Sequence, residues 1–115
     1  MKEAPLLVRT FDLAAWLLGH QGDTDVTTVP ALNLLDAVVL ALKGFDRERN
    51  LDAADEAAAV LRVRVRLAHQ LGVIDERQLL FAAKELDEIG RQLGGLQRHL
   101  ARGAPAPKGG EGRLR

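Results

Sequence analysis

The strongest constraint on the fold is the helical periodicity of residues 75–101. Apolar residues recur there every three or four positions, which places them on one face of an α-helix. They are Leu79, Ala82, Ala83, Leu86, Ile89, Leu93, Leu96 and Leu100. Asp75 and Gln78 have the spacing of a capping box, and Ile74 with Leu79 have the spacing of a hydrophobic staple. The sequence therefore predicts a long amphipathic helix that begins just after Asp75.

A first helix is predicted over about 5–18, with Pro5 in its first turn and Gly19 after its end. Its main apolar face is predicted to hold the residues at three- and four-residue spacing. They are Leu7, Phe11, Ala14 and Leu18. Leu13 and Trp16 fall on the other side of this helix.

The two helices between these are predicted from their end signals. The second begins with Thr27 or Thr28 as its N-cap and ends before Gly44. Its polar stripe is narrow, so we expect it to be the most buried helix. The third begins with Asn50 or Asp52 as cap and ends at about residue 71, before a glycine.

Short connections make consecutive helices antiparallel neighbours, and no strand pattern competes with the helices. The predicted fold class is therefore all-α, an up-down-up-down antiparallel four-helix bundle over residues 1–102. Residues 103–115 are rich in proline and glycine, so we expect a disordered C-terminal tail.

Composition excludes several classes of function. The chain has no cysteine, which removes disulfides and thiolate zinc sites, and it has no serine to act as a hydrolase nucleophile. Its 115 residues include 16 basic and 16 acidic side chains, so it lacks the basic excess of a strong non-specific nucleic-acid binder. Arg9 and Asp12 interrupt the first apolar stretch, so we expect no membrane segment and a cytoplasmic protein.

The sequence contains no candidate residues for metal binding or for catalysis. A di-iron bundle requires Glu-x-x-His motifs, and none of His20, His69 and His99 has a glutamate three positions before it. The glycine cluster of the tail precedes no helix, so it is not a phosphate-binding loop. The sequence therefore predicts a protein that is not an enzyme and that uses no cofactor.

Basic residues gather in the last halves of the third and fourth helices. Acids at a helix start and bases at its end complement the helix dipole, which accounts for most of this pattern. Arg64 is the exception, because it lies near the apolar side of its helix and must snorkel, pair with an acid or face a partner. The candidate residues for binding nucleic acid or a protein partner are Arg62, Arg64, Arg66, His69, Arg91 and Arg98.

Four apolar residues are predicted to lie off the core faces of their helices. They are Leu13 and Trp16 on the first helix, and Leu80 and Phe81 on the fourth. Large apolar side chains on an outer surface favour protein–protein contact. These four residues are therefore the candidate interface of a homo-oligomer.

Residues 61–95 carry a family resemblance. The stretch contains an L-R-x-x-x-R-L-A run, a Leu-Gly turn, an aromatic residue after the next helix start, and an E-I-G-R-x-x-G-G signature. The residues in the last signature are Glu88, Ile89, Gly90, Arg91, Gly94 and Gly95. In these motifs the chain resembles the accessory variability determinant (Avd) proteins of diversity-generating retroelements. Glycines within a helix are costly, so they favour either close approach of a neighbouring helix at Gly90 or an early helix end near Gly94.

The resemblance implies a specific function. Avd proteins are four-helix bundles that assemble as pentameric barrels, bind the reverse transcriptase of the element, and bind RNA or DNA through a basic surface. On that basis Arg62, Arg66 and Arg91 are expected to contact a partner or RNA. The zero net charge and an acidic loop with Asp23 and Asp25 favour the alternative, a neutral scaffold that binds proteins without nucleic acid.

Overall fold

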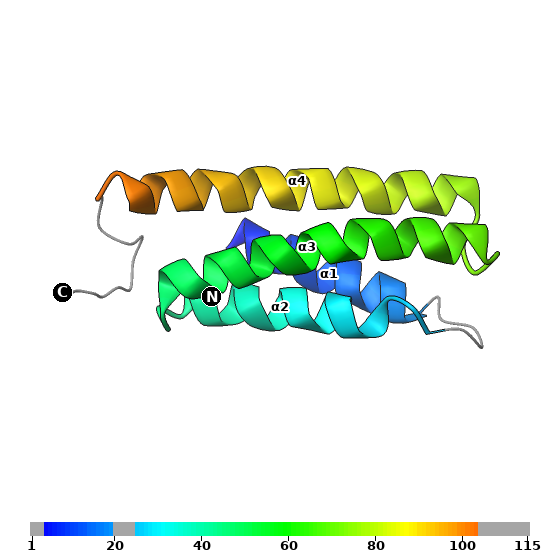
Figure 1. Cartoon of the computed structure of the whole chain (residues 1–115), viewed down its shortest axis with the longest axis horizontal. Helices are drawn as coiled ribbons and strands as arrows, with labels where there is room; N and C mark the ends of the chain where they lie inside the picture. The colour runs from blue at the N-terminus through cyan, green and yellow to red at the C-terminus, as the bar shows by residue number, and fades with distance from the viewer. Residues whose placement is uncertain (1–3, 20–24, 104–115) are drawn as a thin grey trace.

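The computed structural model describes residues 4–19 and 25–103, and these form four α-helices (Figure 1). Their bounds are α1 Pro5–Gly19, α2 Thr28–Leu42, α3 Arg47–Gln70 and α4 Glu76–Ala101. The described residues contain no strand, so the predicted all-α class is confirmed. The predicted tail lies almost entirely in residues 104–115, outside the described ranges.

The helices run up and down in chain order and form an antiparallel bundle. Each helix packs against its sequence neighbours, and α1 also packs against α4, which closes the bundle. In Figure 1, α4 lies above α3, α2 lies below it, and α1 lies behind. The closest packing is between α2 and α3, and the loosest is between α1 and α4.

The start of α4 matches its sequence signal. The Asp75 carboxylate accepts a hydrogen bond from the backbone N–H of Gln78 at 2.8 Å, and the Gln78 side chain accepts one from the backbone N–H of Asp75 at 2.8 Å. This reciprocal pair satisfies two donors that a helix start would otherwise leave open. The predicted capping box is therefore confirmed, and α4 continues through all three glycines to Ala101 rather than ending near Gly94.

The start of α3 differs from the prediction. The helix begins at Arg47, with Asp46 in a left-handed conformation as the N-cap residue. The Asn50 side chain does not cap a helix start but donates to the carbonyl of Phe45 at 2.6 Å. The prediction of Asn50 or Asp52 as cap was wrong because the short turn at Gly44, with φ +91°, lets the N-cap fall at Asp46, four residues before Asn50.

The inward face of α1 also differs from the prediction. Leu13 is 2% exposed and part of the core, whereas Phe11 is 58% exposed. The buried residues of the helix are Leu6, Thr10, Leu13, Ala14 and Leu17. Two sides of this helix are apolar, so spacing alone did not identify the buried one.

Helix α2 has an unusual surface. Six of its fifteen residues are buried, the largest share of any helix, in agreement with the predicted burial. However, Val29, Leu32 and Leu40 on its outward side are exposed, with Val29 at 65%. The narrow polar stripe therefore reflects an apolar outer surface as well as a buried inner one.

The predicted apolar face of α4 does point inward. Ala82, Leu86, Ile89 and Leu93 are buried, and Leu79, Leu96 and Leu100 pack against the core at its margins. None of the described helices is long and apolar enough to span a membrane.

Candidate functional site

Arg62 on α3 is tied to α4 within the same chain. Its guanidinium forms an ion pair with Asp87 and donates a hydrogen bond to the carbonyl of Leu86 at 3.0 Å. A Cβ atom at Gly90 would lie only 3.0 Å from Nη2 of Arg62, so this glycine leaves the space through which the arginine crosses α4. The prediction was a neighbouring helix close to Gly90, whereas the atom nearest to this position belongs to the Arg62 side chain.

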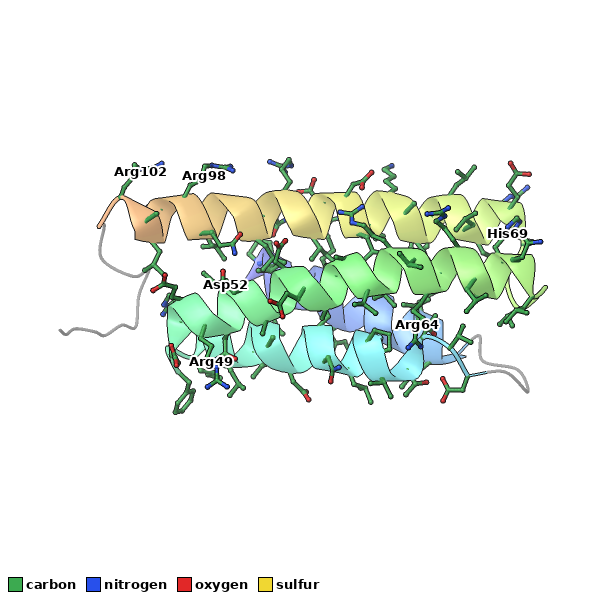
Figure 2. All side chains as sticks on the ribbon, viewed as in Figure 1. Arg49, Asp52, Arg64, His69, Arg98 and Arg102 are labelled. Atoms are coloured by element: carbon green, nitrogen blue, oxygen red, sulfur yellow. The ribbon has the colours of Figure 1, made fainter. Side chains whose placement is uncertain are left out.

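Arg64 is partly buried and faces α2 (Figure 2). Its guanidinium donates to the backbone carbonyl of Val26 at 2.6 Å, just before the start of α2. A backbone carbonyl is not among the three possibilities that the sequence left open, so the prediction did not include the bond that the structure shows. Arg66 is exposed and His69 is half-buried near the end of α3, so α3 contributes only one fully exposed arginine of the predicted set.

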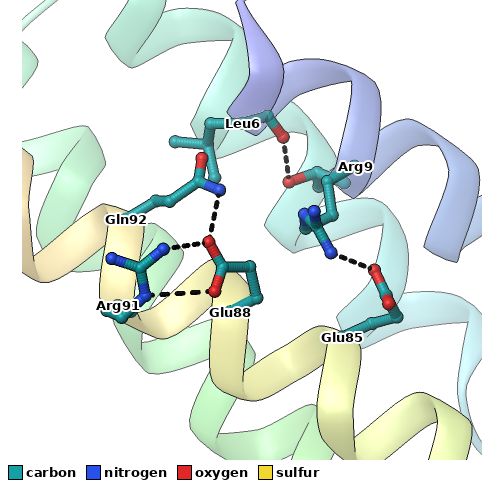
Figure 3. Close-up of polar contacts among 7 residues, drawn as sticks. Leu6, Arg9, Glu85, Glu88, Arg91 and Gln92 are labelled. Carbon is teal, nitrogen blue, oxygen red and sulfur yellow. Dashed lines mark hydrogen bonds and ion pairs between the residues drawn. The ribbon is translucent and has the colours of Figure 1, made fainter.

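A polar seam joins α1 to α4 (Figure 3). Arg9 donates to Glu85 at 2.8 Å, and one turn further along α4 the Glu88 carboxylate pairs with Arg91 and accepts from Gln92 at 2.9 Å. The hydrogen bond from Arg91, followed by that from Gln92, lowers the pKa of Glu88 from 4.5 to about 2. In turn, Glu88 raises the pKa of Arg91.

The outward side of α4 carries a row of basic residues, which we call the α4 basic row. Its members are Arg77, Lys84, Arg91, Arg98 and Arg102. All five are exposed, and the first four follow one another at intervals of seven residues. Seven residues make nearly two helical turns, so these four project from one side of the helix at about 10.5 Å intervals.

Most of this row has no ion-pair partner within the described part of the chain, although Glu85, Asp87 and Glu88 lie beside Lys84 and Arg91. Only Arg91 forms an ion pair there, with Glu88. Figure 2 shows Arg98 and Arg102 pointing away from the bundle. The sequence analysis included Arg91 and Arg98 in its candidate set but missed Arg77 and Lys84, which their seven-residue spacing would have identified.

The predicted oligomer interface needs correction. Leu13 was predicted to lie on an outer face, but it is buried in the core of its own chain because α1 turns this side inward. Trp16 is partly buried and packs edge-on against Phe81, with ring centroids 4.9 Å apart and an angle of 61° between the rings. These two aromatic residues therefore contact each other across the α1–α4 seam, and Leu80, at 61% exposure, remains the most open residue of the four.

Most exposed large apolar residues lie away from α4. Thirteen are exposed in the described chain, and only Leu80 and Phe81 belong to α4. Four of the others lie on α2 or line the groove that α2 forms with α3, and we call their surface the α2 face. Its members are Val29, Leu32 and Leu40 of α2 and Val60 of α3.

A groove between α2 and α3 runs along this face. Val29, Leu40 and Val60 supply its apolar lining, and Asp36 and Glu56 supply its acids. The sequence did not predict this surface, because the narrow polar stripe of α2 does not show which of its apolar residues the bundle leaves exposed.

Among the described residues no group of three histidine or acidic side chains could hold a metal ion. No protein-family model, curated protein or solved structure matches the chain. The class that the fold defines is an antiparallel four-helix bundle with one charged and one apolar side. Its function is therefore inferred from these two surfaces.

Proposed function

We propose that this chain is a non-enzymatic accessory protein of a diversity-generating retroelement. In this role it forms a homo-oligomeric ring in the cytoplasm, binds the reverse transcriptase and holds RNA or DNA during cDNA synthesis. The proposal combines the resemblance of residues 61–95 to Avd proteins with the charge distribution of the surface. No cofactor takes part in it.

The observation that carries the nucleic-acid part is the α4 basic row. A nucleic-acid strand is a line of phosphates, and arginine or lysine residues along a rigid helix match it by charge and shape. Four of the five residues in the row have no ion-pair partner among the described residues, so binding phosphate breaks no salt bridge at these positions. Zero net charge is compatible with this role because the local potential, rather than the sum over the chain, decides where a polyanion binds.

The predicted binding residues take different parts in this proposal. Arg98 and Arg91 belong to the row, and Arg66 is a separate exposed arginine on α3. Arg62 and Arg64 already donate to groups within the chain, so we assign them to holding the helices together. This assignment separates arginines that are available to a ligand from arginines whose hydrogen bonds stabilise the bundle.

A second function is favoured by the α2 face and by the zero net charge. In this alternative, the chain is a scaffold that joins protein partners through apolar contacts and binds no nucleic acid. The two functions differ in one measurable property, because only binding to phosphates releases counterions and depends strongly on salt.

The test is the binding of a single-stranded RNA oligonucleotide, followed by fluorescence anisotropy at several salt concentrations. If four side chains of the row contact phosphates, log K should fall with log salt with a slope of about −2.8, or about 50-fold between 50 and 200 mM. Arg98→Glu should weaken binding and make the slope shallower by about 0.7 or more.

Arg49→Glu is the matched control, because it makes the same charge change at an exposed arginine on α3, away from α4 (Figure 2). It should leave most of the salt-dependent binding intact. Absence of wild-type binding at low salt would contradict the nucleic-acid function and favour the scaffold. Equal losses in the Arg98 and Arg49 variants would contradict the assignment to α4.

A further inference from the structure

The outward side of α2 holds one acid and one base in an otherwise largely apolar surface. Asp36 and Lys43 are both exposed and are separated by seven residues, so they project from nearly the same side of the helix about 10.5 Å apart. Leu32, Val39 and Leu40 lie beside and between them. Neither charged residue has an ion-pair partner among the described residues.

This pattern is complementary to itself when the helix is reversed. If two α2 helices pack antiparallel about a two-fold axis between Val39 and Leu40, residue 36 of each copy lies opposite residue 43 of the other. Asp36 of one copy then meets Lys43 of the second, and the same pair repeats on the other side of the axis. A two-fold contact uses one surface twice, so such reciprocal complementarity is what it requires.

The groove beside α2 adds to the same complementarity. Glu56 of α3 lines it together with Asp36, so an incoming lysine meets two carboxylates rather than one. Leu40, which lies next to the two-fold axis, supplies exposed apolar area that leaves water when a second copy docks. The acids at the middle of this surface also disfavour a nucleic-acid strand, whose phosphates carry the same charge sign.

We propose that the α2 face is a two-fold contact between two copies of this chain, with Asp36 of each copy paired to Lys43 of the other. The contact does not depend on the retroelement function. It also differs from a five-fold ring, whose contacts join two unlike surfaces head to tail. If rings form through other faces, the α2 contact joins them in pairs.

The test measures molar mass by light scattering after size exclusion, over a range of protein concentrations. The wild type should show an even number of copies. Asp36→Lys and Lys43→Asp should each place like charges opposite one another and weaken the two-fold association by about tenfold or more. The double variant D36K/K43D restores opposite charges at both positions and should recover the wild-type mass.

Mixing the two single variants gives a second and sharper test. One carries two lysines and the other two aspartates at these positions, so they should pair with each other at concentrations where neither pairs with itself. Asp55→Lys, at an exposed acid on another side of α3, is the matched control and should leave the mass unchanged. The far-ultraviolet circular dichroism of every variant should show an unchanged helix content.

Three outcomes would overturn the proposal. A wild type that stays a single copy at all concentrations would leave the α2 face to another protein or another ligand. An odd-numbered ring whose mass is indifferent to both single substitutions would keep the ring and exclude the two-fold contact. Failure of the two single variants to pair in a mixture would exclude the assigned register.

Discussion

The outward sides of α2 and α4 show how similar inner surfaces can support different outer ones. Both helices bury leucines in the same core, with Leu34 at 1% and Leu86 at 0% exposure. Outward, α2 presents Val29, Leu32 and Leu40, whereas α4 presents a line of arginine and lysine side chains. The core therefore determines which side of each helix is buried and leaves the other side free for a separate role.

The comparison also shows that the net charge of the chain does not describe the charge of either surface. A formal charge of zero describes the sum over the chain, but a ligand meets one side at a time. The segment 91–102, which is the second half of α4 and its C-cap residue, carries three arginines and no acid. The α2 face carries acids within an apolar surface, and its potential partners are accordingly different.

The largest expected effect is on stability, and it tests whether the buried sides of α2 and α4 contribute equally to the core. Leu34→Ala and Leu86→Ala should each lower the free energy of unfolding by about 2–5 kcal/mol, because each leaves a cavity in the same core. Leu32→Ala, on the outward side of α2, should cost much less in a dilute sample. Chemical denaturation of the three variants makes the comparison, and a cost at Leu32 equal to that at Leu34 would contradict the assigned orientation of α2.

The next effect concerns the helix starts. Asp75→Ala removes the acceptor for the Gln78 N–H and should cost about 1 kcal/mol of stability. Glu76→Ala, in the same turn, removes no side-chain hydrogen bond within the described residues and should cost only about a few tenths of a kcal/mol through the helix dipole. Thermal unfolding measures both, and equal costs would mean that charge rather than capping stabilises this end.

A smaller effect separates the glycines of α4. Gly95→Ala should stabilise the protein by about 0.5–1 kcal/mol, because its Cβ would lie in ordinary contact, 4.0 Å from the Arg98 guanidinium. Gly90→Ala should gain less or lose stability, because its Cβ displaces the Arg62 side chain that reaches Asp87. Equal gains in the two variants would show that the Arg62 crossing contributes nothing to stability.

The smallest effect is a titration. The pKa of Glu88 lies near 2, below its usual 4.5, so the Glu88 ion pair contributes stability above about pH 4.5 and loses it as the pH falls toward 2. Arg91→Gln removes the main cause and should return the pKa of Glu88 toward 4.5. Carboxyl chemical shifts followed by NMR measure this directly, and an unchanged pKa in the variant would exclude Arg91 as the cause.

The sequence predicted the bundle well because each helix carries its own signals. The capping box at Asp75, the glycine after α2 and the apolar face of α4 all depend on residues close together in the chain, and all are confirmed. The rotation of α1 was not predictable in this way. Leu13 and Phe11 lie on two apolar sides of one helix, and only packing against α2 and α4 decides between them.

The candidate sites were harder to predict for the same reason. Whether an arginine is available depends on what neighbouring helices place beside it, and the sequence does not show that Arg62 reaches Asp87 or that Arg64 reaches Val26. The regular spacing of the α4 basic row was visible in the sequence, because it depends on one helix alone. The α2 face required the structure, since exposure is a property of the assembled bundle.

We propose that the outward side of α4 binds nucleic acid and that the outward side of α2 binds a second copy of the chain. The most direct test is a series of amide NMR spectra, first on dilution of the protein and then on addition of a single-stranded RNA oligonucleotide. Dilution should shift the amide resonances around Asp36, Val39 and Leu40, because it separates the two copies. Addition of RNA should shift those around Lys84, Arg91 and Arg98. If both treatments perturb the same residues, or if RNA perturbs α2 and leaves α4 unchanged, the account is contradicted.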